Sequence, residues 1–188
     1  MVLADHSDRS GSATWLLREV IAQDLSRAVI ATLADRAATE RLRAQGVKAG
    51  DDVDMTVGGL VDESAGAPVP IRGKVLSVGE GFQKGAGQFW ANIAFGRGNV
   101  LVLSPYLTQI MEPSWLMPLG LDPADFNVFA LKSRVHFRRG FDDSGFAKTI
   151  LLVEPSEPFL GTVHLEALDY RAIDRSRYYP YGDPPFPG

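Results

Sequence analysis

Two short polar segments contain most of the residues that could do chemistry in this chain. Residues 5–12 offer two carboxylates, one imidazole and three hydroxyls, and they lie between an apolar run and a helical pattern. A helix N-terminus favours an anion there, because its first N–H groups have no intrahelical partner. Residues 132–139 contain five basic or imidazole side chains among eight, in a chain that is acidic as a whole. This second segment predicts either an anion-binding loop or a set of ion-pair partners for acidic loops nearby.

Other chemistry receives little support from the motifs. If the two segments were adjacent, His6, His136, Asp5 and Asp8 could form a site with two histidine and two carboxylate ligands. The sequence contains no closely spaced histidine pair typical of metal sites, so we expect no metal in this chain. A nucleophile elbow, a dinucleotide fingerprint and a phosphate-binding loop are also absent. The third histidine, His164, lies in an alternating run and is expected on a surface strand.

The order of apolar and helical patterns predicts an α/β fold. A strand at 2–4, a helix at 13–28, a strand at 28–33 and a helix at 35–44 form a strand–helix–strand unit with a right-handed crossover. Two more runs have the composition of interior strands of a parallel sheet, and a short helix precedes them. The two runs are at 127–131 and 149–153, and the short helix is at 113–121.

A β-rich section at about 51–104 lies inside this pattern and reads as an antiparallel meander or small barrel. We therefore predict one domain over residues 1–188, with a mostly parallel sheet, flanking helices and this antiparallel middle. A Pro-rich, aromatic tail at about 170–188 cannot form a regular helix or a central strand. It is expected to wrap the surface or to reach a partner. In such a sheet the carboxyl ends of the parallel strands are the usual ligand sites, and both polar segments follow such ends.

Composition excludes several classes of partner. The chain has 19 basic and 23 acidic residues, which argues against binding nucleic acid or an anionic membrane surface through bulk charge. It has no cysteine, no apolar run long enough to span a bilayer and no signal peptide, so a cytoplasmic location is expected. An apolar strand begins one residue after Met1, which suggests a chain that continues a larger protein or was trimmed; a native start on a strand is the alternative.

Several strings, taken in order, resemble one known family. They are VLAD followed by a small polar loop, the glycine pair Gly58-Gly59, and KSRVHFRRGF from Lys132 onward. Together they resemble the C-terminal domain of the microcystinase C-like (MlrC-like, M81) metallopeptidase family over nearly the whole chain. The most specific matches are Lys132, Ser133, His136, Phe137 and Arg138. Asp8 matches an aspartate of the family's first loop, whereas Arg9-Ser10-Gly11 replaces the residues that usually follow it.

This resemblance implies half of an enzyme. Family members carry zinc on an N-terminal domain, and their C-terminal domain closes the site and contributes polar residues. The chain would then be the non-metal-binding part of a zinc-dependent amide or peptide hydrolase, inactive alone, whose partner is an N-terminal metal-binding domain or chain. Asp8 and His136 would be catalytic residues lining the cleft. The residues expected to bind a small anionic or peptide-like substrate are Asp5, His6, Lys132, Ser133, Arg138 and Arg139.

Two other interpretations stay open. In one, the chain is a non-catalytic anion-binding or assembly domain, with the basic segment holding a ligand and the tail holding a partner. In the other, both segments are ion-paired caps with a purely structural role. Self-association into a homo-oligomer is compatible with each of them.

Overall fold

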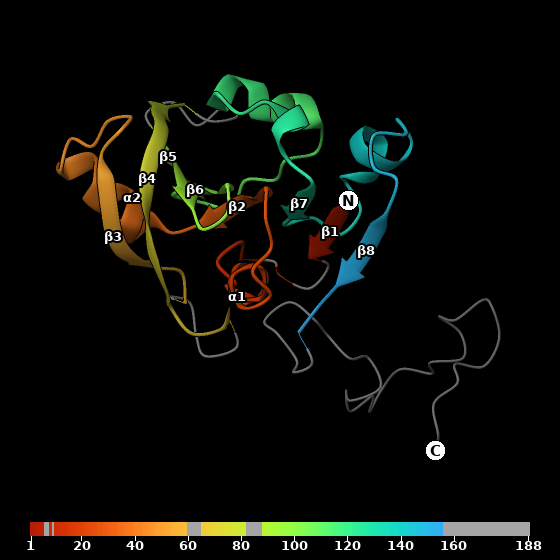
Figure 1. Ribbon diagram of the computed structural model, residues 1–188, viewed down its shortest axis with the longest axis horizontal. Helices are drawn as coiled ribbons and strands as arrows, with labels where there is room; N and C mark the ends of the chain where they lie inside the picture. Colours follow the sequence, from red (N-terminus) through yellow and green to blue (C-terminus); the bar gives the residue numbers. More distant parts are fainter. Residues whose placement is uncertain (6–7, 9, 60–64, 82–87, 156–188) are drawn as a thin grey trace, which may run out of the picture.

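The computed structural model describes residues 1–5, 8, 10–59, 65–81 and 88–155. Within these residues the chain forms an eight-stranded mixed sheet in the order β3-β4-β5-β6-β2-β7-β1-β8 (Figure 1). The strands are β1 (Val2–Asp5), β2 (Ala28–Ala34), β3 (Asp52–Val57), β4 (Val69–Glu80), β5 (Phe89–Phe95), β6 (Asn99–Ser104), β7 (Val128–Leu131) and β8 (Ile150–Val153). The predicted α/β class, with a parallel part and an antiparallel middle, is confirmed.

The antiparallel middle is a meander that shares one strand with the parallel part. Strands β3 to β6 pair antiparallel in chain order. Strand β6 then pairs parallel with β2, and the parallel pairing continues through β7 and β1 to β8. The β-rich section is therefore a continuation of the same sheet, and the alternative of a separate small barrel is wrong.

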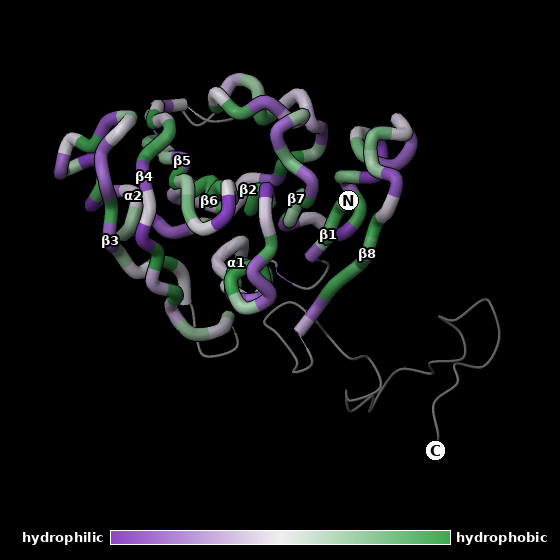
Figure 2. Tube along the Cα trace, in the orientation of Figure 1, coloured by the Kyte–Doolittle hydropathy of each residue, from purple (hydrophilic) through white to green (hydrophobic). Residues whose placement is uncertain are grey.

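Helical segments cover both faces of the sheet, and the alternation of side chains along each strand supplies both cores. Helices α1 (Trp15–Ala22) and α2 (Arg36–Ala44) pack on the face that carries Ile30. The short helices η2 (Pro113–Leu119), η3 (Pro123–Asp125) and η4 (Arg138–Asp142) follow on the other side, where Leu116 and Phe141 pack against Val29. Apolar residues are concentrated in the central strands β2, β6 and β7 (Figure 2). No helix of the described residues is long and apolar enough to cross a membrane.

Two sequence expectations need correction. The helix predicted at 13–28 ends at Ala22, because the chain turns at Asp24 and Arg27, which both have a positive φ, and then enters β2. The run at 149–153 was expected in the interior of the sheet, but β8 is the last strand of the sheet within the described residues. The side chains of Leu151 and Leu152 are accordingly 47% and 51% exposed. The histidine strand expected around His164 and the tail lie outside the described residues.

Asp35 links α2 to the meander, and its removal tests this connection. Its Oδ1 accepts a hydrogen bond from the Ala38 N–H at 2.8 Å as the helix N-cap, and its Oδ2 accepts one from the Gly58 N–H at 2.8 Å. We expect Asp35→Ala to lower the free energy of unfolding by about 2–3 kcal/mol, because two N–H groups lose their acceptor inside the protein. Urea unfolding measures the loss. Asp122→Ala, which removes an exposed cap on Ala124, is the control and should cost less than about 1 kcal/mol; equal losses would contradict this role.

Candidate functional site

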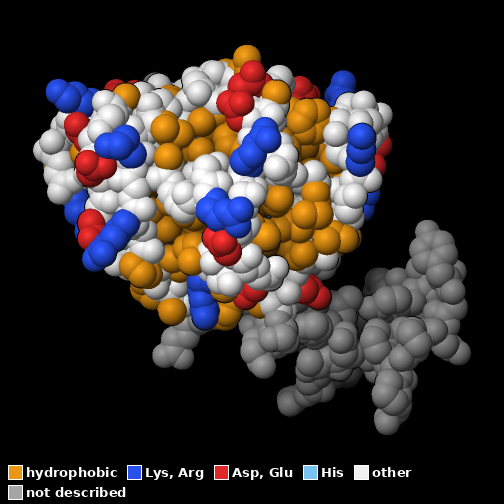
Figure 3. Space-filling model, in the orientation of Figure 1, with side chains coloured by type: hydrophobic (Ala, Val, Ile, Leu, Met, Phe, Trp, Pro, Cys, Tyr) orange, Lys and Arg blue, Asp and Glu red, His pale blue; other side chains and the backbone are white. Residues whose placement is uncertain are grey.

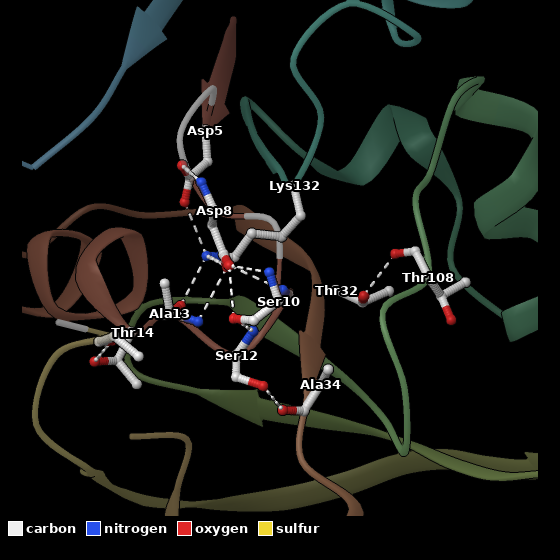
Figure 4. A network of polar contacts seen from close by, with 12 residues as sticks. Asp5, Asp8, Ser10, Ser12, Ala13, Thr14, Thr32, Ala34, Thr108 and Lys132 are labelled. Atoms are coloured by element: carbon white, nitrogen blue, oxygen red, sulfur yellow. Dashed lines mark hydrogen bonds and ion pairs between the residues drawn. The ribbon is translucent and has the colours of Figure 1, made fainter. Parts of the chain in front are cut away.

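The two polar segments lie side by side at the carboxyl edge of the parallel strands. Strands β1 and β7 are neighbours, with Ala4 paired to Leu131, so Asp5 at the end of β1 and Lys132 directly after β7 leave the sheet together. Asp8, Ser10, Ser12 and Ala13 lie beside this point, ahead of α1 (Figure 4). The topology thus brings together residues more than 100 positions apart in the chain, with Lys132 and Asp5 separated by 127 positions.

A buried lysine joins the two segments. The Lys132 Nζ lies 3.0 Å from Oδ2 of Asp5 and 2.9 Å from Oδ2 of Asp8, and it donates to the Ala13 carbonyl at 2.7 Å (Figure 4). An ammonium group has three N–H donors, so these partners use all of them. The lysine side chain is 1% exposed. We call Asp5, Asp8 and Lys132 the buried ion cluster; it leaves Lys132 no donor for a ligand.

Asp8 organises the loop between β1 and α1. Its Oδ1 accepts hydrogen bonds from the Ser10 N–H, the Ser10 hydroxyl and the Gly11 N–H at 2.9, 2.8 and 2.9 Å. Its Oδ2 accepts the Ala13 N–H at 3.0 Å in addition to the lysine, and the side chain is 0% exposed. Gly11 needs its positive φ of 74° for this turn, and a Cβ there would lie 2.7 Å from Leu107. The chain's own carboxylate therefore occupies the place that the sequence predicted for an anion near the helix start.

The ion cluster shifts the pKa of two of its members. Burial alone raises the pKa of Asp8, but the Lys132 charge and the hydrogen bonds from Lys132, Ser10 and Ala13 outweigh it, so the pKa lies below its usual value. Burial likewise lowers the pKa of Lys132, and the charges of Asp5 and Asp8 overcome this effect and raise it. Asp8 therefore stays ionised and Lys132 protonated across the neutral range.

These shifts predict how stability depends on pH. The contribution of Asp8 is fully present above the pKa of an unfolded aspartate, about 3.9, and is lost as the pH falls through the lowered folded pKa. The contribution of Lys132 is fully present below the unfolded value of about 10.4 and is lost as the pH rises through the raised folded pKa. We expect denaturant unfolding to show a shallower acid-side decline for Asp8→Asn than for the unmodified chain. Identical acid-side slopes would contradict the assignment.

The remaining predicted site residues divide into buried and exposed ones. Ser133 is buried, and its hydroxyl accepts the Phe137 N–H at 3.3 Å, which holds the turn of the basic segment. His136, Arg138 and Arg139 are exposed. Arg138 lies 2.8 Å from Asp142 and stacks on the Phe137 ring, whereas the His136 Nδ1 lies 2.9 Å from Oε1 of Gln109. His6 lies outside the described residues.

Gln109 is a residue that the sequence did not single out. It follows Thr108, whose carbonyl accepts the hydroxyl of buried Thr32 at 2.7 Å, so the chain after β6 is fastened to β2 at this point. This attachment holds Gln109 beside His136, 27 positions further along the chain. No motif or spacing connects the two residues, and only the sheet order could have indicated that their loops are close.

The buried ion cluster does not fit a zinc site. Zinc in proteins is bound by thiolate, imidazole or carboxylate groups with available lone pairs, and this chain has no cysteine. Here the ammonium of Lys132 stands between the two carboxylates, and His136 is on the surface beside Gln109. In the part of the chain that the structure covers, no group of three or more His, Cys, Asp or Glu side chains could hold a metal ion. No chemical step is therefore assigned to a metal on these residues.

The fold and the site define an α/β domain whose strand-end loops are joined by a buried lysine and two aspartates. A family model described as "MlrC C-terminus" matches residues 3–160, and the chain belongs to this family. Among curated proteins it is similar to microcystinase C from Sphingomonas sp., with 28% identity over 169 residues, which cover 84% of this chain and 32% of the relative. The resemblance inferred from the sequence is thus confirmed.

A solved structure supports the fold. It is that of a metallopeptidase-like protein from Mesorhizobium sp. BNC1, with a TM-score of 0.66 and 15% sequence identity. The similarity covers 90% of this chain and 38% of that protein. The chain therefore spans about a third of the length of the relatives that it matches.

Proposed function

We propose that this chain is the C-terminal part of a metallopeptidase-like hydrolase that cleaves amide or peptide bonds. Its family membership and its similarity to microcystinase C support this proposal. The catalytic zinc would be bound by a part of the enzyme that corresponds to the rest of those relatives. The carboxylates described here support such a division, because Lys132 already engages both of them. The lack of cysteine fits a reducing compartment, and we place the hydrolase in the cytoplasm.

The observation that carries this proposal is the connection of both strand-end segments by one buried lysine. It fixes the first turn of the basic segment and leaves His136 and Arg139 exposed at its surface. Guanidinium groups bind carboxylates and oxyanions through paired N–H donors. We assign substrate contact to this exposed surface, with Arg138 and Arg139 binding a substrate carboxylate or the developing oxyanion and His136 beside the reacting group. Asp5, Asp8 and Lys132 hold this exposed surface in position.

Metal analysis tests whether the catalytic zinc is bound by another part of the enzyme. We expect the purified 188-residue chain, dialysed against zinc and then washed, to retain much less than one equivalent of zinc by mass spectrometry of the metal. The reason is that its two central carboxylates are bound to Lys132. Stoichiometric zinc that survives competition with a weak chelator would overturn the assignment of zinc to another part of the enzyme.

Association with the proposed metal-binding part tests the activity itself. The tagged chain would be used to capture the product encoded directly upstream of its reading frame, and the complex would be assayed for zinc and for hydrolysis of peptide amides. We expect activity in the complex that Arg139→Ala lowers at least tenfold and that Arg72→Ala, at the far end of the sheet, leaves unchanged. An inactive complex that still binds carboxylate or phosphate anions through Arg139 would instead support the non-catalytic anion-binding or assembly domain.

A further inference from the structure

The two edges of the sheet differ in how they are protected. At the β3 edge, Asp54 and Asp52 form ion pairs with Arg72 and Lys74 of β4 at 2.8 and 2.7 Å. Charged side chains on an edge strand discourage a further strand from pairing with it. The β3 edge therefore has the features of a strand that stays at the surface.

Strand β8, as far as the structure describes it, has no charged side chain to protect its edge. All its residues, Ile150–Val153, are apolar, and among the described residues β8 pairs only with β1. Leu151 and Leu152 point to opposite faces of the sheet, because neighbouring side chains alternate, and both are about half exposed. An exposed, apolar edge strand invites the addition of another strand. This edge has the features of a strand that is covered in the native protein.

An apolar groove lies next to this edge. It has a volume of about 510 Å³ and is lined mainly by apolar side chains of α1, β1 and β8, with the polar residues Asp5, Glu19, Gln23 and Glu154 also in its lining. Figure 3 shows hydrophobic side chains gathered over β8 and between β8 and α1. Pro155 also lines the groove, so the chain leaves the described part of the molecule at the groove itself.

We propose that the chain's own C-terminal segment, residues 156–188, covers the β8 edge and this groove. The segment starts at the mouth of the groove, so its first residues need no linker to reach it. Residues 162–166 alternate apolar and polar, as a strand with one solvated face does, and residues 154–161 are long enough to reverse the chain. They would add a strand antiparallel to β8. The proline and aromatic residues that follow supply apolar surface for the groove.

Paramagnetic labelling tests this proposal on the full chain. The sequence has no cysteine, so one introduced cysteine provides a single attachment site for a nitroxide label. A label at Gln23→Cys, on the α1 side of the groove, should broaden the amide NMR signals of residues 156–188 at least twofold. A label at Asp52→Cys on the opposite edge should leave those signals sharp. Leu151→Asp should abolish the broadening from Gln23→Cys, because it replaces an exposed apolar residue of β8 in the groove lining with a charged one.

Three results would overturn the proposal. One is a set of sharp signals for residues 156–188 in the Gln23→Cys chain, provided that the chain is folded. Another is broadening that persists unchanged in Leu151→Asp. The last is broadening that appears only when spin-labelled and isotope-labelled chains are mixed, since this would show that a second copy covers the edge. Failure of the proposed hydrolase function would leave each of these readouts unaffected.

Discussion

Replacing Lys132 by methionine is expected to lower the free energy of unfolding by about 3–5 kcal/mol. Methionine keeps most of the side-chain volume but removes the charge that faces Asp5 and Asp8. Two carboxylates would then lie close together in the protein interior without their common cation. The Ala13 carbonyl would also lose its donor. Urea unfolding followed by tryptophan fluorescence measures the loss.

The control for this substitution is another lysine in an ion pair. Lys74 lies 2.7 Å from Asp52, a distance similar to those made by Lys132, but the side chain of Lys74 is 54% exposed. Water screens such a pair, so Lys74→Met should cost less than about 1 kcal/mol. Similar losses of unfolding free energy in the two variants would show that burial does not make the ion pairs of Lys132 more stabilising.

Replacing Asp8 by alanine is expected to lower the free energy of unfolding by a similar amount, roughly 3–5 kcal/mol, for a different reason. The N–H groups of Ser10, Gly11 and Ala13 would lose their acceptor, and Lys132 would keep only one carboxylate. Hydrogen exchange should therefore accelerate first at the Gly11 and Ala13 amides. The control is Asp54→Ala, which removes an exposed partner of Arg72 and should change stability by less than about 1 kcal/mol. Native-like exchange at both amides in Asp8→Ala would contradict the role of this carboxylate.

The sequence predicted the elements of the fold better than their limits. Strongly apolar runs such as β2 and β7 are recognisable because their composition alone indicates burial. The end of α1 was missed, since Asp24 and Arg27 adopt a positive φ that their residue types do not announce. The position of β8 at the edge of the described part of the sheet was not predicted either, because an apolar composition indicates that a strand is buried but not which strands lie beside it.

The candidate site was predicted in location but not in arrangement. Parallel strands end at a common edge, so the proximity of Asp5 and Lys132 follows from the topology. Which of the five basic or imidazole residues at 132–139 would be buried could not be derived from composition. The one usable signal was position: Lys132 directly follows the fully buried β7, whereas Arg138 and Arg139 lie beyond the turn. The resemblance implied that Asp8 is a catalytic residue, whereas its buried hydrogen bonds favour a positioning role.

A double-mutant cycle between Asp8→Asn and Lys132→Met tests most directly whether one buried ion cluster holds the two segments together. Lys132→Met alone leaves two buried carboxylates, and Asp8→Asn removes one of these charges. The double variant should therefore be less destabilised than the sum of the single variants, by about 2 kcal/mol or more. Losses that add to within about 0.5 kcal/mol would show that Asp8 and Lys132 act independently, and would contradict the account.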